Sequence, residues 1–507
     1  MLCLASGKAS QRNNTGFSQD CLIKHVWRFA ESLHRTSTRR MLASMTGAAE
    51  LARVFLAAWE KYLTALVSGV LEGQEPTQGL SAAAPPSRAA SSPDCVLRER
   101  RFPDRRLAPR PLGAHLASAM TLWSSSRTVL RRLKDVPPIS SPAGERLRGL
   151  AGEVDALGSD NVAAALDLAV EGRARSYLTG LEAYRRHPYR RDDHAPPVLW
   201  REGTTRLLDY GGKTGGPTVL IVPSLINRFY VLDLLPELSF LRYLARRGLR
   251  PLVIDWGAPG KHERSFDLSD YIARRLETAF DTASSLAGAP IGIAGYCMGG
   301  LFALALALRC PHQTACLALL ATPWDFHAGS AQPARLFGLI SDYLPLLCDE
   351  QGTLPVDVVQ SLFFLLDPFT AERKFRRFAG LDPNSAEARA FVALEDWVND
   401  GVPLAAAVAR DCAGSWYRDN APARGQWKVG DEIVDPTRLR QPALVVLPSR
   451  DRIVPPSSAA PLARVLGGAT VLRPRFGHVG MMSAGAAPAV LWSAIADWLR
   501  GQLNPND

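Results

Sequence analysis

One cysteine occupies a sequence that suits a catalytic nucleophile. Cys297 is the centre of the pentapeptide 295–299, which has the form G-x-C-x-G and separates a strand-like apolar run from a helix-like stretch. Only small residues fit two positions before and after the nucleophile in so tight a turn, which accounts for Gly295 and Gly299. The N-terminal N–H groups of the following helix would favour a thiolate. We therefore predict that Cys297 is a catalytic nucleophile.

A cysteine nucleophile needs a base and a group that orients the base. In enzymes with this turn, the chain order is nucleophile, acid, histidine. His478 is the last histidine in the chain and precedes the final helix-like stretch, whereas Asp451 follows a strand-like run. Other acids are less well placed, namely Asp431, Asp435 and Asp497. We predict a triad in which His478 carries protons and Asp451 fixes its tautomer.

Acyl transfer also needs N–H donors for the negative charge that develops on the carbonyl oxygen. The backbone N–H of Met298, directly after the nucleophile, is one candidate. A second donor normally comes from the loop after the first central strand, here residues 223–230. We predict that Leu225 or Ile226 provides it.

These residues need a scaffold, and the chain from Leu207 onward predicts one. The predicted strands are 218–222, 251–255, 291–294, 315–321, 443–447 and 470–472, and the predicted helices are 234–247, 268–286, 299–309, 458–466 and 487–500. Continuous apolar strands with intervening helices indicate a buried, mostly parallel sheet. The alternation stops between Pro323 and Arg438. With the G-x-C-x-G turn, the pattern predicts an α/β-hydrolase fold whose cap is inserted after the sixth strand.

The remaining chain predicts a helical N-terminal region. We divide the sequence into a disordered segment 1–40, an amphipathic helix 41–73, a Pro/Ala/Arg-rich linker 74–111, a helical region 112–190, a core in two parts, 191–323 and 439–503, and a cap 324–438. Helices are expected at 112–134 and 160–186. The apolar face of the amphipathic helix packs on the main domain, the favoured interpretation, or meets an apolar surface or partner helix. Arginines between 98 and 110 form a solvated basic loop or, less favoured, an anion site.

Composition limits the partners and the compartment. The 507-residue chain has a formal net charge of +10, which favours anionic partners such as coenzyme A phosphates, anionic lipid or nucleic acid, although no nucleic-acid motif is present. None of its eight cysteines forms a CxxC pair, so we expect no metal site and reduced thiols in the cytosol. Residues 1–10 lack a signal-peptide pattern, and charges within 51–71 argue against a membrane span.

Several motifs together resemble those of polyhydroxyalkanoate synthases. They are Val222-Pro223-Ser224-Leu225-Ile226-Asn227-Arg228-Phe229-Tyr230-Val231-Leu232-Asp233-Leu234, Val253-Ile254-Asp255-Trp256-Gly257, Gly295-Tyr296-Cys297-Met298-Gly299-Gly300, Thr322-Pro323-Trp324-Asp325-Phe326, Asp451-Arg452-Ile453-Val454-Pro455 and Gly477-His478. The resemblance covers roughly residues 185–503, and the Ile-Asp-Trp-Gly segment is most similar to the short class III catalytic subunit. Arg452 stands where the family usually has histidine, and the usual Asn-Pro after His478 is absent.

The resemblance implies a polymerase of 3-hydroxyacyl-coenzyme A with Cys297 as the acylated residue, His478 as the base and Asp451 as its support. It implies coenzyme A thioester as substrate with no further cofactor, a homodimer or partner subunit, and a cytoplasmic enzyme at a polymer granule surface. Apolar residues of the cap would cover a tunnel and form a dimer surface, or else fill the core of the cap itself; they include Phe363, Phe364, Phe369, Trp397 and Trp416.

Two other functions remain open at this stage. A thioesterase or esterase would use the same triad with water as the acceptor, because the shape and dryness of the cap select the acceptor. A non-catalytic granule-associated protein would use the amphipathic helix 41–73 for surface binding. The presence of Cys297, Asp451 and His478 together argues against the second alternative, since no structural role requires all three.

Overall fold

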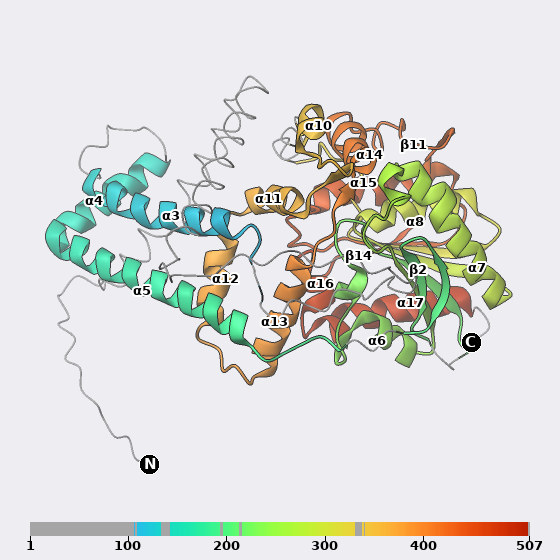
Figure 1. Ribbon diagram of the computed structural model, residues 1–507, viewed down its shortest axis with the longest axis horizontal. Helices are drawn as coiled ribbons and strands as arrows, with labels where there is room; N and C mark the ends of the chain where they lie inside the picture. Colours follow the sequence, from blue (N-terminus) through green and yellow to red (C-terminus); the bar gives the residue numbers. More distant parts are fainter. Residues whose placement is uncertain are drawn as a thin grey trace, which may run out of the picture. The chain divides into compact units, whose positions relative to one another are not determined.

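The computed structural model describes residues 106, 109–132, 142–192, 196–211, 215–329, 337–338 and 340–504 (Figure 1). The chain divides into two compact units. Among described residues, one unit comprises Gly113–Ala183 with Pro368–Gly380, and the other comprises the remainder. The predicted disordered segment 1–40, the amphipathic helix 41–73 and almost all of the linker 74–111 lie outside the described residues.

The larger unit is built around an eight-stranded sheet with the order β1-β2-β6-β3-β7-β8-β13-β14. Its strands are β1 (Val198–Glu202), β2 (Thr205–Asp209), β3 (Thr218–Val222), β6 (Arg250–Asp255), β7 (Ile291–Tyr296), β8 (Thr314–Leu320), β13 (Ala443–Val446) and β14 (Thr470–Leu472). The first two strands are antiparallel to their neighbours, and all other pairings are parallel. The predicted, mostly parallel α/β sheet is therefore confirmed.

Helices cover both faces of this sheet (Figure 1). One face carries α7 (Glu277–Ala287) and α8 (Met298–Arg309), and the other carries α6 (Phe240–Arg246) and α17 (Ser493–Leu503). Strands β3, β7 and β13 are buried throughout, as their continuous apolar sequences require. The largest fully buried side chain is Trp492, which packs edge-on against Phe240 of α6 at 5.7 Å between ring centres. The predicted triad residues lie at the carboxyl ends of strands β7, β13 and β14.

The helix predicted at 234–247 is shorter than expected, and its first turns are wrong. Residues 233–239 form a small antiparallel hairpin, β4 (Asp233–Leu235) and β5 (Leu238–Ser239). Helix α6 then begins at Phe240, because the Ser239 side chain accepts the N–H of Arg242 and caps the helix. Pro236 between the strands also disfavours a continuous helix there.

A long insertion joins β8 to β13. Its elements in the larger unit are η5 (Ser341–Tyr343), α10 (Leu344–Leu347), β9 (Thr353–Leu354), α11 (Val356–Leu366), α13 (Ala386–Asn399), β10 (Leu404–Ala405), α14 (Ala406–Arg410), the π-helix η6 (Asp411–Arg418), β11 (Lys428–Val429), β12 (Glu432–Ile433) and η7 (Pro436–Arg438). Short 3-10 and π-helical segments complete the core, namely η2 (Phe229–Leu232), η3 (Glu263–Ser265), η4 (Asp270–Leu276) and η8 (Pro488–Trp492), with helices α15 (Pro456–Val465) and α16 (Gly480–Ser483).

The smaller unit is helical. It contains α3 (Leu112–Arg132), α4 (Pro142–Leu157), most of α5 (Ser159–Arg186) and α12 (Thr370–Phe378). Helices α3 and α5 match the two predicted helices, whereas α4 was not predicted. Helix α12 packs closely on α5: Phe375 lies edge-on to Tyr177, and a Cβ built on Gly180 would lie 1.9 Å from the Phe375 carbonyl oxygen. A glycine is therefore required where these two helices touch.

One arginine of the predicted solvated loop is buried instead. Arg106 has 8% of its surface exposed, and its guanidinium donates to Asp396 of α13 at 2.6 and 3.0 Å. It also donates to the carbonyl oxygen of His187 at 2.6 Å. Arg110 pairs with Asp357 of α11 at 2.9 Å. The solvated interpretation is thus wrong for Arg106, because a carboxylate 290 residues away compensates its burial.

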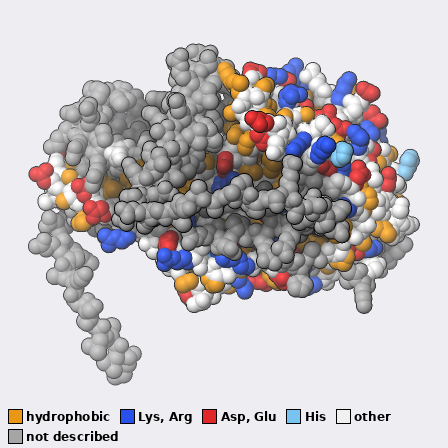
Figure 2. Space-filling model, viewed as in Figure 1, with side chains coloured by type: hydrophobic (Ala, Val, Ile, Leu, Met, Phe, Trp, Pro, Cys, Tyr) orange, Lys and Arg blue, Asp and Glu red, His pale blue; other side chains and the backbone are white. Residues whose placement is uncertain are grey.

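The described surface carries mixed charge. Figure 2 shows lysine and arginine side chains interspersed with aspartate and glutamate on the described part of one face. No helix in the described ranges combines the length and apolar character needed to cross a membrane.

Candidate active site

Cys297 lies at a strained turn between β7 and α8. Its φ of 56° and ψ of −127° place a non-glycine residue in a region that L-residues seldom adopt. Its N–H donates to the Leu320 carbonyl oxygen of β8 at 2.9 Å, and its own carbonyl accepts the N–H of Gly300 at 2.9 Å. The predicted strand-turn-helix geometry around Cys297 is therefore present.

Three glycines let this turn form. A Cβ on Gly295 would lie 2.4 Å from the Cα of Gly300, and one on Gly299 would lie 2.1 Å from the Val222 carbonyl oxygen. A Cβ on Gly300 would lie 1.8 Å from the Thr322 hydroxyl oxygen. Real Cβ atoms do not approach so closely, so the turn tolerates no side chain at these positions. Gly300 was not among the predicted turn glycines, although it stands next to one of them.

Asp451 and His478 meet at the ends of β13 and β14. His478 Nδ1 lies 2.7 Å from Asp451 Oδ2, and both side chains are buried. The other carboxylate oxygen accepts the N–H groups of Ile453 and Val454, each at 2.8 Å. These bonds hold the carboxylate towards the imidazole, as an orienting acid requires.

Negative charge at Cys297 and the bond to Asp451 change the pKa of His478. Burial alone would lower the pKa of His478. The charge on Cys297, the hydrogen bond to Asp451 and the hydrogen bond with Cys297 outweigh that effect and raise the pKa from 6.5 to about 10. The protonated imidazole of His478 is thus stabilised by Asp451 and by negative charge at Cys297. The structure brings together all three predicted triad residues.

Two tyrosines at this site were not predicted. Tyr296, the residue before the nucleophile, stacks on the His478 ring at 5.2 Å and donates its hydroxyl to the His478 carbonyl oxygen at 3.1 Å. The second tyrosine is Tyr417 of η6. Burial raises the pKa of the Tyr417 hydroxyl, and the negative charge of Cys297 raises that pKa further. The sequence could have indicated Tyr296, because it directly precedes Cys297 and is the last residue of strand β7. Nothing in the sequence around Tyr417 indicates its nearness to Cys297.

The predicted oxyanion donors differ in availability. Met298 begins α8 and is buried directly beside the nucleophile. The N–H of Ile226 donates to the Ser224 hydroxyl at 3.2 Å, so its donor is already used. Leu225 is the better candidate on the second loop. That loop begins next to the elbow, because a Cβ on Gly299 would also lie 2.6 Å from the Pro223 carbonyl oxygen.

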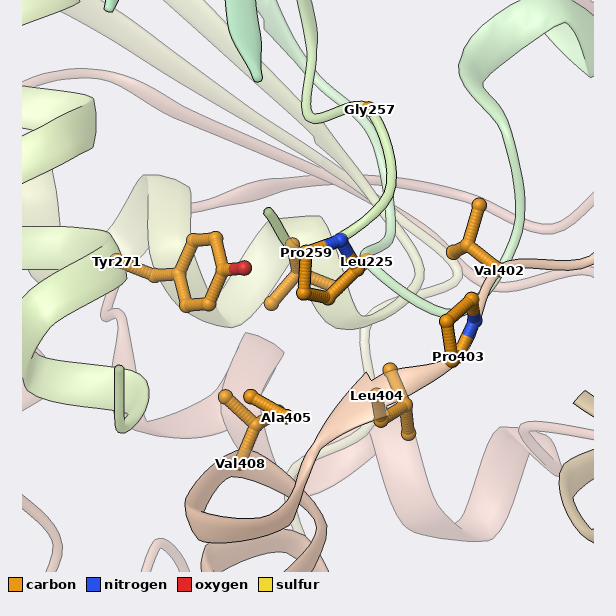
Figure 3. Close-up of a pocket in the computed structure, with 9 residues that line it drawn as sticks. All are labelled: Leu225, Gly257, Pro259, Tyr271, Val402, Pro403, Leu404, Ala405 and Val408. Atoms are coloured by element: carbon orange, nitrogen blue, oxygen red, sulfur yellow. The ribbon is translucent and has the colours of Figure 1, made fainter. Parts of the chain in front are cut away.

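A small apolar pocket adjoins Leu225 (Figure 3). Its lining combines the loop after β3, the turn after β6, η4 and the inserted segment after α13, through Leu225, Gly257, Pro259, Tyr271, Val402, Pro403, Leu404, Ala405 and Val408. Most of the lining side chains are hydrocarbon, and the Tyr271 hydroxyl points towards them (Figure 3). The cavity of about 10 Å³ is large enough for only about one water molecule. In the described ranges, no group of three or more His, Cys, Asp or Glu side chains is placed to bind a metal.

Comparison with known proteins places this geometry in a family. The family model described as alpha/beta hydrolase fold matches residues 217–484, just over half of the chain. The poly(3-hydroxyalkanoate) polymerase subunit PhaC of a Synechocystis species is 30% identical over 290 residues, which cover 55% of this chain and 77% of the relative. The chain belongs to the poly(3-hydroxyalkanoate) polymerase PhaC family within the α/β-hydrolase fold. The predicted family is thereby confirmed.

Other members of the PhaC family match over a similar stretch. The PhaC subunit of Haloferax mediterranei is 29% identical over 316 residues, and that of Haloarcula marismortui is 28% identical over 317 residues. Each match covers 59% of this chain. The chain spans 63% and 66% of these two relatives, just under two thirds of their length.

Proposed function

We propose that this chain is an acyltransferase that polymerises 3-hydroxyacyl-coenzyme A into a polyhydroxyalkanoate through a thioester on Cys297. The observation that carries the proposal is the Cys297–His478–Asp451 arrangement at a nucleophile elbow in a member of the PhaC family. A thiolate suits repeated acyl transfer, because it attacks a thioester readily and also leaves more easily than an alkoxide.

The first step loads the nucleophile. The Cys297 thiolate attacks the thioester carbon, the oxyanion accepts hydrogen bonds from the N–H groups of Met298 and Leu225, and the coenzyme A sulfur leaves. The imidazolium of His478 gives its proton to that sulfur. One thioester is broken and another is formed, so the step is balanced without any further reactant.

The second step lengthens the polyester. Neutral His478 removes the proton from the 3-hydroxyl group of the acceptor, whose oxygen attacks the acyl group on Cys297. An ester bond forms, the thiolate leaves, and His478 is again an imidazolium beside it. Asp451 accepts the hydrogen bond of the His478 Nδ1–H group throughout and keeps the imidazole in one orientation.

Exposed arginines around the triad loops support an anionic acyl donor. Arg450 and Arg452 flank the triad aspartate, and Arg473 and Arg475 precede the histidine; all four are exposed. The two loops are joined by a hydrogen bond from the Arg450 N–H to the Phe476 carbonyl oxygen at 3.0 Å. We propose that these arginines attract the phosphates of coenzyme A.

Partners and location follow the same proposal. The relatives are named as polymerase subunits, and we propose that this chain likewise works as a homodimer or with a partner subunit. The growing polyester is insoluble, so the enzyme would act at a polymer granule surface in the cytoplasm.

One assay with the purified chain tests the proposed function. The chain is given 3-hydroxybutyryl-coenzyme A, and free thiol and insoluble polymer are both followed with time. We expect thiol release with polymer, and a covalent acyl adduct on Cys297 that mass spectrometry finds in the unaltered chain but not in Cys297→Ala. Thiol release with only free hydroxy acid would show a thioesterase instead. An adduct that persists in Cys297→Ala would show that another residue is the nucleophile.

A further inference from the structure

The loop that carries the second oxyanion donor is held at its beginning by the sheet. The indole N–H of Trp256, directly after β6, donates to the Pro223 carbonyl oxygen at 2.9 Å. The same carbonyl lies close to Gly299 of the elbow. The first residue of the loop is therefore fixed relative to the nucleophile, whereas Leu225 depends on what holds the other end.

The far end of this loop is held by the C-terminal end of α13. The Trp397 indole N–H donates to the Arg228 carbonyl oxygen at 2.7 Å. Arg228 Nε lies 2.9 Å from Asp400 Oδ2, and the Tyr230 hydroxyl donates to that same oxygen at 3.0 Å. One carboxylate oxygen thus binds two residues of the loop.

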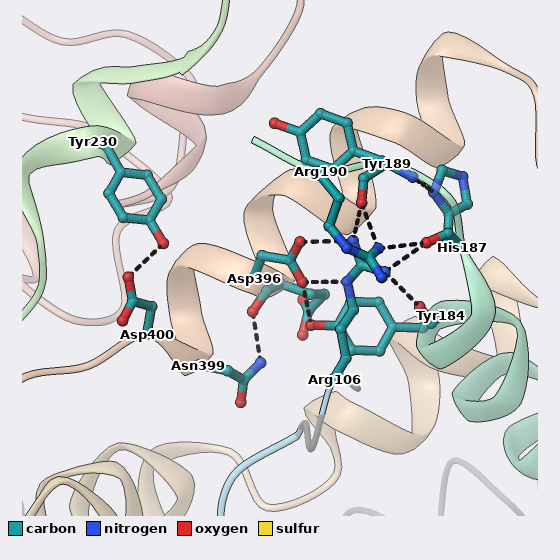
Figure 4. Close-up of polar contacts among 10 residues, drawn as sticks. Arg106, Tyr184, His187, Tyr189, Arg190, Tyr230, Asp396, Asn399 and Asp400 are labelled. Atoms are coloured by element: carbon teal, nitrogen blue, oxygen red, sulfur yellow. Dashed lines mark hydrogen bonds and ion pairs between the residues drawn. The ribbon is translucent and has the colours of Figure 1, made fainter. Parts of the chain in front are cut away.

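Helix α13 is itself anchored near this end. Figure 4 shows Asp396 between the Arg106 guanidinium and the Tyr184 hydroxyl, with Asp400 facing Tyr230. Arg106 Nε donates to Asp396 at 2.6 Å, and Tyr184 donates to it at 2.8 Å. These contacts make the last turn of α13 a fixed support for the loop.

We propose that Asp400 is a positioning residue for acyl transfer: it fixes Arg228 and Tyr230, and through them the backbone that presents the Leu225 N–H. This inference rests on the proposed function, because the Leu225 donor matters only when a carbonyl oxygen gains charge next to Cys297. A displacement of about 1 Å in such a donor can cost roughly a hundredfold in rate.

The Arg228–Asp400 ion pair is partly exposed, which bears on whether Asp400 positions the loop or stabilises the fold. Arg228 and Asp400 keep 32% and 31% of their side-chain surface exposed. An ion pair this exposed adds little to the free energy of unfolding, since water screens it. The Tyr230 side chain is buried, however, so its hydroxyl loses a partner when Asp400 is replaced by alanine, which lowers the free energy of unfolding. The variant that also carries Tyr230→Phe removes that hydroxyl, and so separates the loss of positioning from the loss of stability.

The test compares four variants of the full chain. They are Asp400→Ala, Asp400→Asn, Tyr230→Phe and the Asp400→Ala/Tyr230→Phe double variant. The matched control is Asp497→Asn on α17, which breaks another exposed aspartate–arginine pair, that with Arg247. The rate constant of the first thiol release from 3-hydroxybutyryl-coenzyme A is measured in rapid-mixing experiments, together with its amplitude, the half-saturating concentration and the melting temperature.

We expect Asp400→Ala to slow acylation about tenfold or more at saturating donor, with the half-saturating concentration close to that of the control. Its melting temperature should fall because the buried Tyr230 hydroxyl loses its acceptor, and the double variant should recover part of that fall without recovering the rate. Asp400→Asn, which can still accept the Tyr230 hydroxyl, should recover part of the rate. The double variant should be no slower than Asp400→Ala alone, because both changes remove the same support.

The outcomes distinguish a failure of the positioning role of Asp400 from a failure of the proposed acyltransferase function. An unaltered rate constant in Asp400→Ala, or a loss confined to amplitude and melting temperature, would overturn the positioning role and leave the proposed function intact. Absence of thiol release from the unaltered chain would overturn the proposed function and the inference with it.

Discussion

His478 Nδ1 lies 2.7 Å from Asp451 Oδ2, and the opposite oxygen of that carboxylate accepts two backbone N–H groups. The carboxylate is therefore held from one side by its own loop and presents its free side to the imidazole. This arrangement separates the orienting role of Asp451 from its structural role, because an amide could keep the backbone bonds but not the charge.

Asp451→Asn should reduce polymerisation strongly while the chain stays folded. The amide oxygen can still accept the N–H groups of Ile453 and Val454, but the imidazolium loses its negative partner. For a comparable triad the loss is roughly ten-thousandfold. Initial rates of thiol release and the circular dichroism spectrum test this expectation. Retention of more than about a tenth of the activity would contradict an orienting role for Asp451.

The stability of the chain should fall with rising pH because of His478. The folded-state pKa, about 10, lies above the ordinary value of 6.5. A group whose pKa is raised on folding stabilises the fold fully below the unfolded pKa, and that contribution is lost as the pH rises from 6.5 through 10. Free energies of unfolding measured across this range should decline less in Cys297→Ala, which lacks the charge that raises the pKa of His478. Parallel pH profiles of the two chains would argue against the thiolate–imidazolium pair.

Tyr296→Phe should weaken the support of His478, the proposed catalytic base. The variant keeps the ring that stacks on His478 but loses the hydroxyl that donates to its carbonyl oxygen. We expect a loss of about 1 kcal/mol in the free energy of unfolding and a severalfold slower acylation. Tyr243→Phe, which alters a partly buried tyrosine of α6 bonded to Arg247, is the control and should leave acylation unchanged. If the two substitutions slowed acylation equally, the Tyr296 hydroxyl would have no specific role in supporting His478.

Gly299→Ala should destabilise the chain by about 3 kcal/mol or more. The added methyl group would lie 2.1 Å from the Val222 carbonyl oxygen, which belongs to a central strand and cannot move freely. Gly501→Ala in α17 is the matched control, since nothing lies within 4 Å of its Cβ position and alanine favours a helix. Chemical denaturation of both variants tests the difference. A Gly299→Ala chain as stable as the control would mean that the elbow can relax.

Reversal of charge beside the triad should weaken the binding of the acyl donor. Arg452→Glu and Arg475→Glu should raise the half-saturating concentration of 3-hydroxybutyryl-coenzyme A severalfold at low salt, and added salt should shrink the difference. Arg246→Glu, at an exposed position of α6, is the control. If all three variants respond alike, net charge rather than this set of arginines attracts the substrate.

The sequence predicts those parts of the site that depend on local rules. The turn at Cys297 is readable because glycines at fixed offsets are required by close backbone approach. The aspartate and the histidine are readable because parallel strands end at the same edge of a sheet. Their catalytic roles remain predictions until the variants above are measured.

Contacts between distant segments could not be predicted in the same way. Arg106 and Asp396 are 290 residues apart, and nothing near either residue indicates the pairing. The Ser239 cap depends on a hairpin whose strands are only two or three residues long. Tyr417 lies 120 residues after Cys297 in the sequence, and the local pattern of η6 does not indicate that the charge of Cys297 acts on it. In each case, the contact depends on tertiary packing between segments, which the local sequence pattern does not determine.

The placement of α12 has a consequence for the order in which the chain folds. The smaller unit draws on Gly113–Ala183 and also on Pro368–Gly380, so its core lacks Phe375 until a ribosome has made residue 380. By that time β1 to β8 have already been synthesised, and the strands that supply Asp451 and His478 have not. The helices at 113–183 must therefore wait, incompletely packed, through the synthesis of most of the sheet. An expression fragment that ends before residue 368 would retain this exposed helical surface and should be prone to association.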